Sequence, residues 1–233
     1  MPKLYLVPNS INETSAISGI DKVNYSEIKD VRVFFVEEPK SARRLLKSLN
    51  AQFPFGECRF FDLNEHSNPK QIQEYAKILK EEDCAIISEA GCPCVADPGA
   101  DLVFLAHQDQ IEVIPLVGPS SILLALMASG LNGQNFAFYG YLPKDRQERS
   151  QKIKMLEDRS LKEKQAQLFM ETPYRNQSLL EDILAAAQDK TLLCIACDIT
   201  GPHQIIKTMS IKEWKKHPLN IDKKPALFLL QKI

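Results

Sequence analysis

Polar and acidic residues follow directly after several apolar runs of this sequence, and one of these places is unusually crowded. The run that ends at residue 87 is followed by Ser88-Glu89 and by a turn, 90–99, with two glycines, two prolines and two cysteines. A carboxylate at Glu89 is suited to bind hydroxyl or amino groups of a ligand. The competing interpretation is a solvated loop acid, because most glutamates are exposed.

Three further apolar runs end in residues of similar chemistry: Pro8-Asn9-Ser10, Glu37-Glu38 and Gly118-Pro119-Ser120-Ser121. The last group precedes a helical segment. Exposed N–H groups and hydroxyls at a helix start favour a negatively charged or carbonyl-bearing ligand group. Ser120 is equally well explained as a simple N-cap, because serine is common at that position.

The order of the elements predicts that these turns lie at one edge of a sheet. In the first half, apolar runs alternate with helical segments, which indicates βαβ units and a mostly parallel sheet. Open α/β sheets bind ligands beyond the carboxyl ends of their strands. We expect strands at 3–8, 30–38, 57–63, 84–88 and 111–117, and helices at 39–50, 68–82 and 99–109.

The second half predicts another α/β domain with a mixed sheet, because several of its strands follow one another without helices between them. Its first helix, 122–130, is apolar all round, which indicates burial between layers, and Gly130 fits its C-cap. We place the domain boundary near Pro115, which gives domains 1–115 and 116–233. The later helices are expected at 145–160, 176–188 and 212–217, and the strands at 135–140, 165–170, 191–199, 203–211 and 225–233.

Composition narrows the class of protein. The net charge is −1, so nothing in the overall charge favours nucleic acid, and any basic patch must be local. No apolar run is long enough to span a membrane, and the start lacks the features of a signal peptide, so we expect a cytoplasmic protein. The sequence has none of the glycine-rich motifs of nicotinamide or phosphate-loop sites and no nucleophile elbow.

Two cysteine pairs raise the alternative of a zinc site: Cys92 with Cys94, and Cys194 with Cys197. The second pair lies in a strand-like run, where positions three apart face opposite ways. We therefore predict no metal site, and buried thiols at these positions instead.

Taken together, the segments resemble the tetrapyrrole-methylase superfamily of S-adenosylmethionine-dependent methyltransferases. "SEAGCPCVADPG" at 88–99 is similar to the signature SDAGTPxxSDPG. Within the superfamily, the chain most resembles the branch that methylates the ribose 2′-oxygen of a cytidine in small-subunit ribosomal RNA. The further matching segments, in order, are "LYLVPNSI", "VEEPKSARRLLKSLN", "IEVIPLVGPSSILLALMASGL", "NFAFYGYLPKDRQERSQKIKML" and "LFMETPYRNQSLLEDI".

The resemblance implies two α/β domains with S-adenosylmethionine in the cleft between them, usually in a homodimer. On it we predict a set of cofactor-binding residues: Pro8, Ser88, Glu89, Gly91, Pro93, Gly118, Ser120, Ser121, Phe169 and Ala226. For Phe169 and Ala226 the alternative is plain core packing.

Candidate catalytic residues are Glu38, Asp97, Glu171 and Arg175. The carboxylates are candidates for the base that assists a ribose hydroxyl, and Arg175 for a cation that orients a phosphate or Glu171. Glu38 and Asp97 have a structural alternative, since helix starts favour acids. For contact with RNA phosphates we name a basic segment, with a solvated mixed-charge helix as the alternative: Lys144, Arg146, Arg149, Lys152 and Lys154.

The sequence also departs from the branch. "PNSINE" stands where the branch has TPIGN, "EEP" where it has EDT, and "CDITGPHQ" where it has RELTKxxE. These changes weaken the prediction of a ribosomal acceptor more than the prediction of methyl transfer. Methylation of a tetrapyrrole or another small molecule, and a diverged S-adenosylmethionine-binding protein without activity, therefore stay as alternatives.

Overall fold

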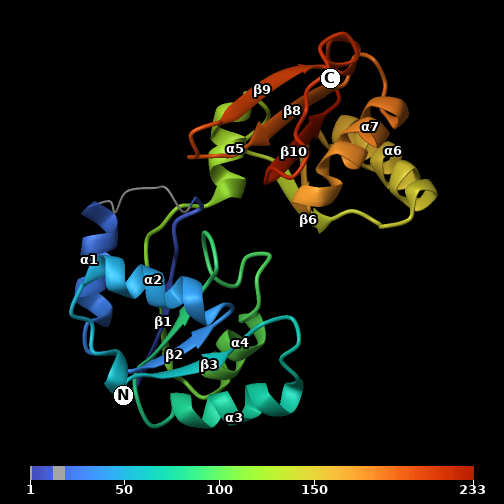
Figure 1. Cartoon of the computed structure of the whole chain (residues 1–233). Helices are drawn as coiled ribbons and strands as arrows, with labels where there is room; N and C mark the ends of the chain where they lie inside the picture. Colours follow the sequence, from blue (N-terminus) through green and yellow to red (C-terminus); the bar gives the residue numbers. More distant parts are fainter. Residues whose placement is uncertain (1, 13–18) are drawn as a thin grey trace. The chain divides into compact units, whose positions relative to one another are not determined.

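Buried apolar runs form two five-stranded sheets, one in each of the two units into which the chain divides, Met1–Ser120 and Ser121–Ile233 (Figure 1). The structure is a computed structural model that describes residues 2–12 and 19–233. The division falls a few residues after Pro115, the last residue of strand β5. The predicted fold class, two α/β domains with one parallel and one mixed sheet, is confirmed.

The sheet of the first unit is parallel throughout, with the strand order β3-β2-β4-β1-β5. All residues of the inner strands β2 and β4 are buried, which explains why these runs are apolar without alternation. The strands are β1 (Lys3–Val7), β2 (Val33–Val36), β3 (Arg59–Asp62), β4 (Cys84–Ile87) and β5 (Glu112–Pro115).

Helices cover both faces of this sheet. Ile28 and Leu46, from α1 and α2, pack on one face, and Leu79 and Leu102, from α3 and α4, pack on the other. Asn68, the first residue of the helix expected at 68–82, is the N-cap of α3 and forms a capping box with Gln71. The helices are α1 (Gly19–Ile28), α2 (Pro39–Leu49), α3 (Pro69–Leu79) and α4 (Ala100–Gln108), with a 3₁₀ turn η1 at Phe55–Glu57.

Helix α1 was not predicted from the sequence. It is short of apolar residues, and one of its inward positions is polar. Asn24 is buried and donates a hydrogen bond to the carbonyl of Val117, 2.6 Å away. A buried asparagine on the inner face breaks the apolar period by which a helix is recognised.

The second unit has a mixed sheet with the order β6-β7-β10-β8-β9, in which only β6 and β7 pair in parallel. Helices α6 and α7 pack on one face, and α5 packs on the other. The strands are β6 (Phe136–Tyr141), β7 (Ala166–Glu171), β8 (Leu192–Cys197), β9 (Ile205–Ser210) and β10 (Ala226–Gln231). The helices are α5 (Ser121–Ser129), α6 (Arg146–Glu163), α7 (Asn176–Ala186) and α8 (Ile211–Trp214), with η2 at Pro173–Arg175.

Helix α5 differs from its prediction. Ala125 and Leu126 are buried, but Leu123 is 51% exposed and Met127 is 79% exposed. Its buried residues join the core on one face of the sheet, and its apolar outer side is open. The expectation of burial all round was therefore wrong for the single chain. Gly130, just after the helix, has φ +72°, as expected of a C-cap glycine.

The cysteines of β8 lie on opposite faces of their sheet. Cys194 packs in the core beneath α5, and Cys197 packs in the core beneath α6 and α7. The alternation predicted from strand geometry is thus present, and the two thiols point away from each other. Across 2–12 and 19–233, no helix combines the length and the apolar character that a membrane span requires.

Candidate active site

The parallel sheet of the first unit brings all its strand-end turns to one edge. Strand β1 leads to α1 on one face and β4 leads to α4 on the other, and the two strands are neighbours. The connections that follow β1 and β4 therefore run to opposite faces of the sheet. Ligands of open α/β sheets bind outside the carboxyl ends at such a point. The turns that follow β1 and β4, which contain Pro8 and Ser88–Gly99, are two of the four turns predicted at this edge.

Asn9 joins these turns and was missed among the predicted site residues. Its backbone N–H donates to the carbonyl of Gly91 at 2.9 Å, and the N–H of Gly91 donates back at 3.0 Å. Its buried side-chain nitrogen lies 3.1 Å from the Ser41 hydroxyl, 3.2 Å from the Ser88 carbonyl and 3.0 Å from the Glu89 carbonyl. One amide thus fixes the turns after β1 and β4 against the start of α2. The available signal was an amide directly after a buried strand.

The predicted residues of the turn after β4 divide into two kinds. Ser88 is buried, and its hydroxyl donates to the carbonyl of Gly91 at 2.8 Å, so it stabilises the turn itself. Pro93 and Gly91 are buried as well, and Gly91 has φ +72°, which a side chain would disfavour. Glu89 is exposed, and of this group only its side chain is open to solvent.

Gly118 and Pro8, both predicted as cofactor-binding residues, are in direct contact. A Cβ atom added at Gly118 would lie 2.2 Å from Cβ and 2.5 Å from Cγ of Pro8. The backbone after β5 therefore packs directly against the turn after β1, with no space for a side chain at Gly118. Ser121 is the first residue of α5, so Ser120 stands directly before that helix.

Three carboxylates gather at this edge: Glu37, Glu89 and Asp97. The N–H of Glu89 donates to the Glu37 carboxylate at 3.2 Å. Burial raises the pKa of Glu37, and repulsion from Glu89 and Glu65 adds to the effect. Burial raises the pKa of Asp97 to about 7, with further repulsion from Glu37 and Glu89. A cationic ligand at this edge would relieve the repulsion among these groups.

Glu38 does not belong to this group, although it was predicted as a catalytic candidate. Its carboxylate accepts a hydrogen bond from the N–H of Ser41 at 2.6 Å and caps α2. The structural alternative for Glu38 is the one that the structure supports, because a capping carboxylate is already committed to the helix. Glu37, its neighbour, carries the carboxylate that reaches the turn after β4.

The raised pKa of Asp97 makes stability depend on pH. The neutral carboxyl is favoured in the folded state, so the stabilisation is complete below pH 4 and is lost as pH rises through about 7. Asparagine does not ionise, so the Asp97→Asn variant should not lose this stability. Between pH 4 and pH 8, its free energy of unfolding should therefore gain about 1–2 kcal/mol relative to that of the wild type. The full pKa difference corresponds to about 4 kcal/mol, which partial exposure reduces. Urea unfolding at both pH values measures it, and a constant difference would contradict the assignment.

A pocket of about 340 Å³ adjoins Asp97. Its walls are residues 63–65 and Ser67 after β3, Ile72 of α3, and residues 97–102 at the start of α4. Leu63, Ile72 and Leu102 form its apolar part, and Asn64 and Glu65 its polar part. The acidic edge therefore opens onto a cavity that combines apolar walls with hydrogen-bonding groups.

In the second unit, Glu171 and Arg175 lie together at the carboxyl end of β7. Their carboxylate and guanidinium are 2.7 Å apart, and the Glu171 side chain is only 2% exposed. The other carboxylate oxygen accepts the N–H of Thr172 at 2.8 Å. Of the two alternatives for Arg175, a phosphate ligand or an orienting partner of Glu171, the pairing with Glu171 is the one the structure displays.

Phe169 and Ala226 were wrong as cofactor contacts through their side chains. Phe169 is fully buried, with its ring stacked at 6.0 Å from that of Phe228. Ala226 belongs to the same core. Their positions near strand ends suggested a site. However, each lies on the face of its strand that packs into the core, so both side chains are buried there. The alternative of core packing is correct for both.

The predicted basic segment is not a single exposed face. Arg149 is buried: its guanidinium pairs with Asp182 of α7 and donates to the carbonyls of Pro143 and Lys144. It was wrong as an RNA contact, because a cation buried against a carboxylate has no phosphate within reach. Arg146 pairs with the same aspartate from the exposed side, and Lys152 lies over the ring of Tyr139. Lys144 and Lys154 are exposed.

The chain is similar in sequence to a known family and to curated relatives over most of its length. Residues 23–215 match the family described as Tetrapyrrole (Corrin/Porphyrin) Methylases. The chain is similar to the ribosomal RNA small subunit methyltransferase I of Vibrio cholerae, with 30% identity over 91% of this chain and 70% of that protein.

Solved structures share the fold. The methyltransferase CobJ superimposes with a TM-score of 0.63 over 100% of this chain and 95% of its own, at 13% identity. Uroporphyrin-III C-methyltransferase from Thermus thermophilus, crystallised with S-adenosylhomocysteine, gives a TM-score of 0.51 over 99% and 97%, at 16% identity. With the sequence match over most of its length, the chain belongs to the tetrapyrrole methylase family.

Proposed function

We propose that this chain is an S-adenosylmethionine-dependent methyltransferase that methylates a ribose 2′-hydroxyl of small-subunit ribosomal RNA. The observation that carries the proposal is the edge of the first unit. There the glycine-containing turns fixed by Asn9 meet the carboxylates of Glu37, Glu89 and Asp97. The ribosomal relative at 30% identity supports the acceptor.

The residues of this edge fit the cofactor. S-adenosylmethionine supplies a methyl group activated on a sulfonium, and it also carries an ammonium group and ribose hydroxyls. Carboxylates that repel one another are suited to cations and hydroxyls. Gly91 adds no side chain to the turn after β4, and Gly118 adds none where its backbone meets Pro8. The main task left to the protein is to align donor and acceptor.

Asp97 is our candidate for the group that takes the acceptor proton. As a methyl group passes to the ribose oxygen, that oxygen must lose its hydrogen, and a carboxylate with a pKa near 7 is suited to receive it. Glu171 is less suited, because both of its oxygens already have partners in Arg175 and Thr172. We expect kcat/KM to rise with pH through about 7, since only the ionised form accepts a proton.

Transfer of a tritiated methyl group tests the acceptor. Small ribosomal subunits that lack the modification should incorporate label, and a 2′-O-methylated nucleotide should survive alkaline hydrolysis as a labelled dinucleotide. The Asp97→Asn variant should lose on the order of 100-fold in kcat. Label in a uroporphyrinogen-type acceptor alone would replace the proposal with tetrapyrrole methylation. Label in neither acceptor would favour a binding protein without activity.

We further propose a homodimer in the cytoplasm, as the resemblance implies. The outer side of α5, with Met127 at 79% exposure, is an apolar surface of the kind that subunit contacts cover. Light scattering on the purified protein measures the mass, and Met127→Lys should shift it toward that of a single chain.

A further inference from the structure

Helix α2 carries four cations on one exposed face: Lys40, Arg43, Arg44 and Lys47. Their spacing, i, i+3, i+4 and i+7, places them in a single row, which we call the α2 stripe. The opposite face of the helix, with Ala42 and Leu46, is buried in the core of the first unit. The row extends about 10 Å along the helix axis, given the rise per residue.

The charges of the α2 stripe are not balanced within the helix, which contains no acidic residue. Lys40, Arg43 and Lys47 have no carboxylate within ion-pair distance among the residues that the structure describes. Glu57, in the neighbouring η1 turn, is paired with Arg32. Like charges four residues apart, and a lysine in the first turn, both destabilise a helix. Helix stability therefore does not account for this pattern.

Helix α3 provides a direct comparison. It also has 11 residues and begins with proline and lysine, and its Lys70 and Lys77 occupy the positions of Lys40 and Lys47. In α3, however, Glu74 stands where α2 has Arg44. Its exposed face is of mixed charge, which is ordinary for a solvated helix. The uniform positive charge is a property of α2.

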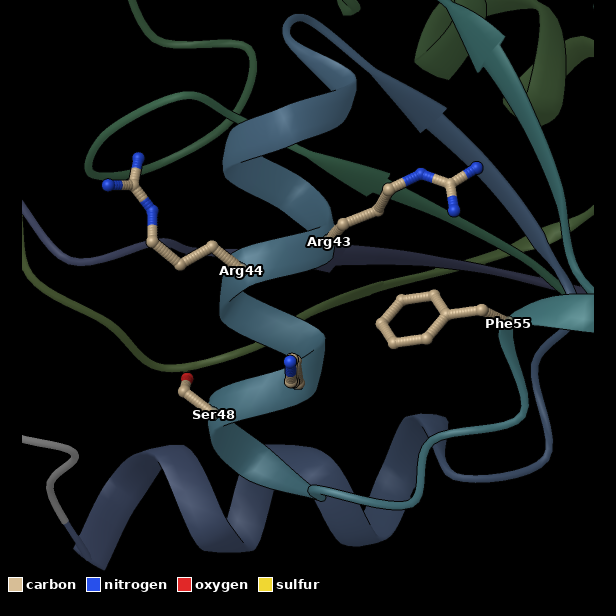
Figure 2. Close-up of a pocket in the computed structure, with 5 residues that line it drawn as sticks. Arg43, Arg44, Ser48 and Phe55 are labelled. Carbon is tan, nitrogen blue, oxygen red and sulfur yellow. The ribbon is translucent and has the colours of Figure 1, made fainter.

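The α2 stripe borders a pocket of about 420 Å³ lined by Arg43, Arg44, Lys47, Ser48 and Phe55 (Figure 2). The Arg43 guanidinium lies 4.4 Å from the centre of the Phe60 ring and 5.7 Å from that of Phe55. These rings hold the guanidinium beside the pocket. Cations next to aromatic rings are the combination with which proteins bind single-stranded nucleic acid.

We propose that the α2 stripe binds the phosphate backbone of the RNA substrate, an inference that rests on the proposed function. Helix α2 begins directly after Glu37 and Glu38, and its Ser41 is hydrogen-bonded to Asn9 at the candidate site. The stripe thus leads outward from the acidic edge. Phosphates of nucleotides next to the methylated one would contact Lys40 first and Lys47 last. These contacts position the RNA and do not read its bases.

The test compares Lys40→Gln/Lys47→Gln with Lys70→Gln/Lys77→Gln, which removes the same charges from the same positions of α3. Arg43→Gln is a second variant, and Arg44, which makes a further interaction, stays unchanged. Binding of each protein to a small-subunit rRNA fragment is measured at several salt concentrations, with S-adenosylhomocysteine binding as the check on folding. The α2 double variant should bind RNA about tenfold more weakly, and its salt dependence should be less steep by about 1.4 in log–log slope. The α3 variant should match the wild type.

Equal RNA binding by the two double variants would overturn the proposed role of the α2 stripe in RNA binding and would leave the proposed function intact. A wild type that binds S-adenosylhomocysteine but neither binds nor methylates RNA would overturn the proposed acceptor, and the stripe with it. A defect with intact small subunits but not with the naked fragment would indicate that the stripe contacts a ribosomal protein, which also overturns the proposal.

Discussion

Arg149→Met is expected to lower the free energy of unfolding by about 3 kcal/mol. Arg149 and Asp182 have side chains that are 7% and 3% exposed, and they join α6 to α7. The guanidinium also donates to the carbonyls of Pro143 and Lys144, which fixes the turn before α6. Methionine fills a similar volume but leaves a buried carboxylate without its main partner, and that loss is the costly part. Urea unfolding measures the change.

Arg146→Gln is the matched control. Arg146 binds the same carboxylate at 2.7 Å, but its side chain is 76% exposed. Solvent screens such a pair, so the loss should stay below about 1 kcal/mol. The double variant Arg149→Met/Asp182→Leu should recover part of the stability, because it removes the unpaired charge as well. Equal losses for Arg149→Met and Arg146→Gln would contradict a structural role for Arg149.

Gly118→Ala is expected to weaken S-adenosylhomocysteine binding by on the order of 100-fold. The added Cβ would lie 2.2 Å from Cβ of Pro8, whose ring has no alternative rotamer with which to move aside. One of the two turns must therefore shift, and Asn9, which follows Pro8, would carry the shift to the turn after β4. Overpacking of this kind also costs about 1–3 kcal/mol of stability. Calorimetric titration gives the Kd.

Gly56→Ala serves as the control for this glycine. A Cβ atom at Gly56 meets no atom within 4 Å, and the residue lies in the η1 turn of the same unit. Its Kd for S-adenosylhomocysteine should equal that of the wild type. If Gly118→Ala also binds with the wild-type Kd while remaining folded, the contact between Gly118 and Pro8 has no part in the site.

Much of the fold follows from local patterns in the sequence. Buried strands such as β2 and β4 are continuous apolar runs, and α2 and α3 begin within one residue of the expected starts at 39 and 68. Helix α1 could not be predicted in the same way. Its buried Asn24 is satisfied by the carbonyl of Val117, far along the chain, and no local pattern shows such a partner.

The turns that form the candidate site could be predicted from the sequence, but the roles of the individual side chains could not. Parallel topology brings Pro8, Gly91 and Gly118 to one edge, and this much can be inferred from the order of strands. Glu37 and Glu38 are neighbours, yet Glu38 caps α2 and Glu37 faces the turn after β4. The sequence does not distinguish these two roles, and so Glu38 was named in place of Glu37. Arg149 has the spacing of a surface cation, yet its partner Asp182 lies on another helix.

A crystal structure with S-adenosylhomocysteine tests the central claim most directly. We predict that the ligand contacts the backbone of Gly91 and Gly118, with its ammonium or ribose hydroxyls at the carboxylates of Glu37 or Glu89. A ligand bound away from the turns after β1, β4 and β5 would contradict the account.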